Sequence, residues 1–101
     1  MNDGKISDNI ARSYGGAGVS AQNFIMHNGE ISGNIAVERM GGGVSAGTFI
    51  MYNGIISDNS ASAGGGGVAA LIFTMHDGEI SDNTSDFYGG GVRVIRNIHD
   101  A

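Results

Sequence analysis

A phrase that recurs along the whole chain is the feature that most restricts the fold. It begins at Met1, Met26, Met51 and Met75 and divides the 101 residues into units of 25, 25, 24 and 23 residues, with a short remainder. Each unit reads M-x-[ND]-G-x-I-S-x-N, then a variable link, a glycine run that closes on Val, and an apolar tail. A fixed period of this length indicates a solenoid, in which each unit packs on its neighbours.

The residues within each unit favour strands. Each of these four methionines is followed by a turn signal, because Gly after Asn or Asp readily adopts positive φ; the pairs are Asp3-Gly4, Asn28-Gly29, Asn53-Gly54 and Asp77-Gly78. Short runs such as Gly-Glu-Ile-Ser and Thr-Phe-Ile-Met have the length of strands and leave no room for a long helix. The pattern predicts an all-β fold, a right-handed parallel β-helix (solenoid) of about four coils with 23–25 residues per coil.

We expect one β-helix domain over residues 1–101, with coils at 1–25, 26–50, 51–74 and 75–97 and a partial coil at 98–101. Differences in unit length fall between the Asn and the Val, so that segment is predicted to be a loop. A leucine-rich repeat is the structural alternative, because I-S-x-N loosely resembles its L-x-x-N. That fold needs a column of leucines, and Leu71 is the chain's single leucine.

Equivalent residues of a parallel β-helix stack about 4.8 Å apart, so the repeat predicts columns of identical side chains. We expect Ile, Val, Phe and Met to point inward, Asn amides to bond from coil to coil, and Gly to permit tight corners without Cβ clashes. The structural ladders are predicted to be Asn9, Asn34, Asn59 and Asn83; Ile6, Ile31, Ile56 and Ile80; and Val19, Val44, Val68 and Val92.

Composition restricts the partners. The formal net charge is −5, with ten acidic residues against five basic ones, which argues against nucleic acid and anionic membranes. The chain has no cysteine, which excludes disulfides and zinc thiolate sites, and no apolar run approaches the roughly 18 residues of a membrane span. Asp3 and Gly4 lie where a signal peptide would be basic and then apolar, so no signal is expected in this chain, and the compartment is left open.

Acidic residues are the first candidates for chemistry. Asp58 and Asp82 fall in one column, with Asp8 beyond Gly33. Stacked acids serve hydrolysis or calcium binding in β-helices that cleave polysaccharides. The column varies, however, and no Lys or Arg recurs beside it, so a solvated acidic face is the preferred interpretation.

Histidines are the second candidates. His76 and His99 would lie one coil apart if residues 98–101 form a partial coil, close enough to share a metal ion. Two exposed imidazoles without a metal are the preferred interpretation. The glycine runs match neither a phosphate-binding loop, which requires a following Lys, nor a calcium-binding nonapeptide, which requires an Asp.

The run from Ile56 to Val68, I-S-D-N-S-A-S-A-G-G-G-G-V, resembles the F-x-x-N and G-G-A-I motifs of chlamydial polymorphic membrane proteins. It is more closely similar to the Gly-rich right-handed β-helix repeats of large bacterial adhesin-like surface proteins. The resemblance covers nearly the whole chain, although Ile replaces the Phe of the motif. It implies an extracellular or cell-surface stalk or adhesive module without a cofactor, with a glycan or another host-surface group as ligand.

The predicted function is therefore a non-catalytic structural or adhesive module. We expect it to form a homo-oligomer through the open β-helix ends or through the apolar segment Val68–Met75. One alternative is a carbohydrate-active β-helix, a hydrolase or lyase with Asp58 and Asp82 as its acids. Another is a module that recognises glycan or ice through a flat face, although Thr48, Thr74 and Thr84 do not form one column.

Overall fold

A computed structural model describes residues 1–12, 17–37, 42–62, 64–86 and 90–94. Within these ranges the chain forms twelve β-strands and no helix. Each predicted loop between the Asn and Val columns lies at least partly outside the described residues, and so does the whole of the predicted partial coil 98–101.

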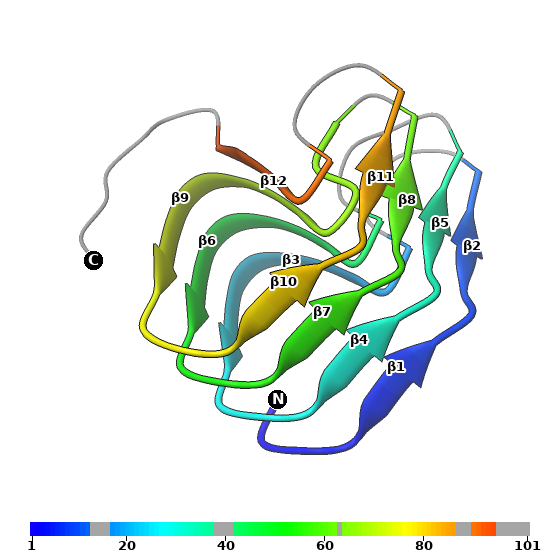
Figure 1. Cartoon of the computed structure of the whole chain (residues 1–101). Helices are drawn as coiled ribbons and strands as arrows, with labels where there is room; N and C mark the ends of the chain where they lie inside the picture. The colour runs from blue at the N-terminus through cyan, green and yellow to red at the C-terminus, as the bar shows by residue number, and fades with distance from the viewer. Residues whose placement is uncertain (13–16, 38–41, 63, 87–89, 95–101) are drawn as a thin grey trace.

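The strands form three parallel sheets of four strands each, one strand per coil in every sheet (Figure 1). The first sheet contains β1 (Lys5–Ser7), β4 (Glu30–Ser32), β7 (Ile55–Ser57) and β10 (Glu79–Ser81). The second contains β2 (Ile10–Ala11), β5 (Ile35–Ala36), β8 (Ser60–Ala61) and β11 (Thr84–Ser85). The third contains β3 (Val19–Met26), β6 (Val44–Met51), β9 (Val68–Met75) and β12 (Val92–Val94).

The register joins each residue to its repeat equivalent in the next coil. Ile6 pairs with Ile31, which pairs with Ile56, and that residue pairs with Ile80. The chain completes three turns between β1 and β10, and β11 and β12 continue the fourth coil. The predicted parallel β-solenoid is therefore confirmed, while its right-handed sense stays a prediction.

The interior is a stack of apolar columns whose middle members are sealed from solvent. Seven apolar side chains among the described residues have no exposed surface: Met26, Ile31, Val44, Phe49, Met51, Ile56 and Val68. Phe49 stacks between Phe24 and Phe73, with ring centroids 5.2 and 5.1 Å apart. Burying one such side chain stabilises the fold by roughly 1.5–3 kcal/mol, so the second and third coils carry most of the core.

The turn that follows the Met at the head of each unit depends on glycine. Gly29 and Gly54 have φ angles of 111° and 114°, and Gly4 and Gly78 are also positive. The Cε atom of Met26 lies only 2.8 Å from where a Cβ of Gly54 would be. Gly29, Gly54 and Gly78 therefore provide both the backbone angle and the space for a methionine of the preceding coil.

The long strands β3, β6 and β9 bend in the middle, which Figure 1 shows as a strong curve. In β6 the side chains of Val44 and Ala46 contribute to the core, and then Phe49 and Met51 do, so the alternation shifts by one residue at Gly47. The ladder skips the same point, because neither Gln22 nor Leu71 pairs with Gly47. The bend exposes 49% of Leu71, although this residue lies in the most apolar run of the sequence.

Candidate functional site

The asparagine column forms a continuous ladder of amide hydrogen bonds along the solenoid. The Nδ2 atom of Asn9 donates to Oδ1 of Asn34, Asn34 donates to Asn59, and Asn59 donates to Asn83, at distances of 2.9, 2.9 and 3.0 Å. Each Oδ1 also accepts the backbone N–H of the preceding asparagine. Asn34 and Asn59 are 0% and 1% exposed, so the ladder satisfies polar groups that water does not reach.

Glycines line one side of this ladder. A Cβ on Gly43 would lie 2.7 Å from the carbonyl oxygen of Gly67 and 3.0 Å from Nδ2 of Asn59. Gly18 and Gly67 face the next coil in the same way, each against a glycine carbonyl and an asparagine amide. No positive φ is involved at these three positions. The requirement for glycine before Val19, Val44 and Val68 is therefore one of close approach between neighbouring coils.

The aspartates singled out for chemistry occupy a corner of the backbone. Asp8, Asp58 and Asp82 have φ angles of 60°, 57° and 55°, and Gly33, which shares their column, has 69°. Asp and Gly are among the residues that adopt this left-handed conformation most readily. The three carboxylates are exposed. The column therefore has a conformational reason to contain Asp or Gly, and that restriction to two residue types was already visible in the sequence.

Exposed rings form a second column beside the turns. His27, Tyr52 and His76 stack with centroids 5.1 and 4.8 Å apart and interplanar angles of 5° and 3°. His99, the predicted partner of His76, lies outside the described residues. Within the part of the chain that the structure describes, no three metal-ligating side chains gather in one place. What His76 contacts is thus the ring of Tyr52.

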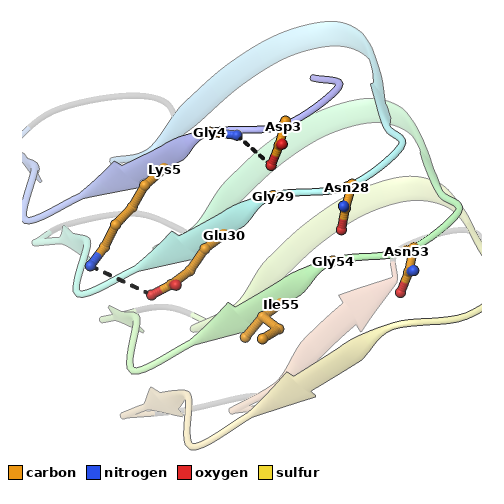
Figure 2. Close-up of a pocket in the computed structure, with 9 residues that line it drawn as sticks. All are labelled: Asp3, Gly4, Lys5, Asn28, Gly29, Glu30, Asn53, Gly54 and Ile55. Carbon is orange, nitrogen blue, oxygen red and sulfur yellow. Dashed lines mark hydrogen bonds and ion pairs between the residues drawn. The ribbon is translucent and has the colours of Figure 1, made fainter.

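A groove lined by both polar and apolar groups runs along the outside of the turns, with a volume of about 410 Å³ (Figure 2). Asp3, Asn28 and Asn53 stand in one column along it, each beside the glycine of its turn. The Nζ atom of Lys5 lies 3.7 Å from a carboxylate oxygen of Glu30, and the two side chains are 60% and 40% exposed. The remaining lining residues are Gly4, Gly29, Gly54 and Ile55. Carboxylate, amide and ammonium groups here face solvent and can bond to hydroxyl groups of a ligand.

Two serines of the first sheet donate hydrogen bonds to glutamates of their own strands. The hydroxyl of Ser32 donates to a carboxylate oxygen of Glu30 at 2.9 Å, and Ser81 donates to Glu79 at 2.6 Å. Both pairs lie two residues apart on one face of a strand, which is the spacing at which strand side chains are neighbours. These serines therefore bond within their own strand.

No protein-family model, curated protein or solved structure matches this chain. The resemblance to adhesin-like repeats stays a prediction that rests on the repeat pattern. Among the described residues, no helix is long and apolar enough to cross a membrane.

Proposed function

We propose that the chain is a non-catalytic structural and adhesive module, a β-solenoid segment of a bacterial surface protein of the adhesin-like type. The observation that carries the proposal is the conformation of the aspartates. Asp58 and Asp82 are the residues best suited to acid chemistry, and both occupy a corner that the chain elsewhere fills with Gly33. Their conformational role accounts for them without a reaction.

The asparagine and serine columns support the same role. Asn34 and Asn59 hold one coil on the next, and Ser32 and Ser81 bond to glutamates of their own strands. These asparagines and serines thus have structural partners, and the chain's regular outer surface is left for contact with other molecules. The function that suits such a surface is binding along the solenoid.

The ligand class that fits the groove of Figure 2 is a glycan. Asp3, Asn28 and Asn53 repeat along the groove from coil to coil, and Lys5 and Glu30 add charged groups beside them. An extended sugar chain presents hydroxyl groups at regular intervals, and amides and carboxylates offer both donors and acceptors to them. The groove is open, so affinity would come from several weak contacts repeated along the ligand.

The adhesive role is tested with the labelled chain on an array of bacterial and host glycans. We expect binding to a set of extended glycans, weakened about tenfold in Asn53→Ala, since the loss of about 1.4 kcal/mol is typical of one or two hydrogen bonds. Asn23→Ala is the matched control, because Asn23 is exposed on β3 and outside the groove. Equal loss of binding in both variants, or no binding at all, would contradict a glycan ligand in this groove.

The catalytic alternative is tested by the viscosity of polysaccharide solutions incubated with the chain. We expect no loss of viscosity over the range of plant, algal and bacterial polysaccharides. Asp82→Asn retains a residue that tolerates positive φ, so it preserves the fold while removing the carboxylate. A loss of viscosity that Asp82→Asn abolishes would overturn the non-catalytic role and favour a carbohydrate-active enzyme.

A further inference from the structure

Two turns of the groove contain the dipeptide in which asparagine is chemically least stable. Asn28 and Asn53 are each followed by glycine, and both side chains are exposed along the groove (Figure 2). The backbone nitrogen of glycine approaches a neighbouring side-chain carbonyl closely, because glycine has no Cβ to obstruct it. Attack by that nitrogen on Cγ of the asparagine closes a small ring. The conformation of the folded turn decides whether this attack takes place.

The same turns in the first and fourth coils show that the side chain reaches the glycine nitrogen. The nitrogen of Gly4 donates to Oδ1 of Asp3 at 2.9 Å, and the nitrogen of Gly78 donates to Oδ1 of Asp77 at 2.8 Å. The two asparagines occupy the same position of the turn in the second and third coils. The native turn therefore brings the carbonyl group of this side chain beside the nitrogen that attacks it, as a near-attack conformation requires.

Hydrogen bonds do not restrain the reacting groups of these two turns. Among the hydrogen bonds of the described residues, none involves the side-chain amides of Asn28 and Asn53 or the N–H groups of Gly29 and Gly54. The turn is held through its carbonyl oxygen instead, since the nitrogen of Ile55 donates to that of Gly29 at 2.9 Å. The nitrogen can thus lose its proton, and the side chain can rotate toward it, while the coils stay joined.

The asparagines of the ladder are protected by the same criteria. Nδ2 of Asn59 donates to Oδ1 of Asn83 at 3.0 Å, and Asn59 is completely buried. The nitrogen that would attack it belongs to Ser60, and this N–H donates to the carbonyl oxygen of Asn34 at 2.9 Å. The reaction at Asn59 would break these buried hydrogen bonds, which is costly. The two classes of asparagine should therefore differ strongly in reactivity.

We propose that Asn28 and Asn53 are sites of spontaneous deamidation in the folded protein, and that Asn28 reacts first. Gly29 is partly exposed whereas Gly54 is buried, so hydroxide reaches the nitrogen of Gly29 more readily. The sequence alone gives no such order, because both asparagines precede glycine. The modification requires water and no enzyme.

The reaction replaces an amide by a carboxylate without oxidation or reduction. The nitrogen of Gly29 loses its proton to hydroxide and forms a bond to Cγ of Asn28, and the bond from Cγ to Nδ2 breaks. Nδ2 takes up a proton from water and leaves as ammonia, and a succinimide remains. Water then opens this ring. Cleavage of the new bond to Cγ gives aspartate, and cleavage of the original main-chain bond gives isoaspartate.

The aspartate product has a counterpart in the repeat itself. Asp3 and Asp77 occupy this position with the turn intact and with a hydrogen bond from the following glycine. Each conversion adds a negative charge to the turns and removes an N–H donor. Carboxylates in neighbouring coils lie in one column with a spacing of about 4.8 Å, where like charges repel. The groove therefore becomes more acidic as the protein ages.

Peptide mapping by mass spectrometry tests the proposal on the intact folded chain, incubated at mildly alkaline pH in isotopically labelled water. Each converted residue should gain one labelled oxygen, because water opens the ring. We expect Asn28 to convert at least about tenfold faster than Asn23, with Asn53 between them, since a well-placed nucleophile accelerates a reaction by this factor or more. Asn23 is the internal control, because it is exposed on β3 and the bulky Phe24 follows it.

A parallel incubation in urea separates the effect of the fold from that of the dipeptide. A folded chain that keeps both amides while the unfolded chain loses them would overturn the proposal, because the turn would then prevent the attack. Conversion of Asn53 before Asn28 would overturn the assigned order. Asn28→Gln is the matched variant, since glutamine would have to close a larger and less favourable ring. It should abolish conversion at position 28 and leave the rate at Asn53 unchanged.

The variants Asn28→Asp and Asn53→Asp reproduce the product. Circular dichroism should show both folded, and an unfolded variant would contradict the fit of the carboxylate in the turn. The consequence for the ligand rests on the proposed function: Asn53→Asp should weaken glycan binding about tenfold, as the loss of one or two hydrogen bonds does. The two proposals fail separately, because deamidation is measured by mass without a ligand. A glycan array without binding leaves the modification in place, and a chain that keeps its amides leaves glycan binding unaffected.

Discussion

At the scale of single residues, this fold depends on polar groups that are buried and on glycines that have no room for a side chain. Asn59 illustrates the first: its amide accepts from both the backbone and the side chain of Asn34, and it donates to Asn83. Gly43 illustrates the second, because it packs against that same amide. The two columns therefore constrain each other.

Asn59→Leu should lower the free energy of unfolding by about 3 kcal/mol or more, because several buried donors and acceptors lose their partners at once. For a chain of this size that corresponds to a fall of at least about 12 °C in the melting temperature. Arg12→Ser, at an exposed position before the first loop, is the comparison and should change little. Thermal denaturation followed by circular dichroism measures both variants. Equal melting temperatures would show that the asparagine ladder is not a source of stability.

Gly43→Ala should destabilise the fold by about 1–3 kcal/mol, because its Cβ would force two coils apart. Gly91→Ala is the matched control in the last coil, where the nearest atom to an added Cβ is Ile80 Cγ2 at 3.8 Å. That variant should be neutral or slightly stabilising. Urea denaturation of the two proteins gives the comparison, and a similar loss in both would mean that close approach is not the reason for the glycine.

At the scale of elements, the sequence predicted the strands and their register but not the bend in the long strands. The columns of Ile, Val and Asn were sufficient for the register, because identical residues recur at the same place in every unit. Gln22, Gly47 and Leu71 share no chemical character, so their common place at the bend leaves no signal in the residue types. The exposure of Leu71 could be found only from the structure.

Two substitutions in β9 separate its interior from its bend. Val68→Ala should cost about 2 kcal/mol of stability, because Val68 is completely buried and the neighbouring coils cannot close the cavity. Leu71→Ala should stay within about 0.5 kcal/mol of the wild type, since half of Leu71 is exposed. Chemical denaturation measures both, and a larger cost for Leu71→Ala would show that the alternation does not shift at the bend.

The candidate sites were less predictable than the strands. The column of Asp and Gly indicated an acidic face. The positive φ angle of Asp58 arises at the corner between β7 and β8, and no local sequence motif indicates that corner. The stacking of Tyr52 with His27 and His76 follows from the register, although residues of different types did not suggest a ring column. Contacts within a column are therefore harder to predict when the column contains different residue types than when it repeats one type.

At the scale of the whole molecule, stability is the sum of contacts between neighbouring coils. Inserting a second copy of residues 26–50 after Ile50 adds one more fully covered coil and should raise the urea midpoint and the m-value together, because more surface is buried on folding. A single transition at an unchanged midpoint would contradict this additive account. Urea denaturation of the lengthened chain beside the original gives the measurement.

The direction of the asparagine ladder gives the molecule an electrical polarity. Backbone hydrogen bonds between coils run both ways, as His27 donates to Met1 and Val19 donates to Gly43, so their dipoles largely cancel. The side-chain amides all point the same way and their dipoles add along the axis, much as peptide dipoles add in a helix. Each coil added to the row polarises the amides already present and strengthens their bonds. A long solenoid of this repeat would therefore have a permanent dipole moment along its axis, which distinguishes one end from the other.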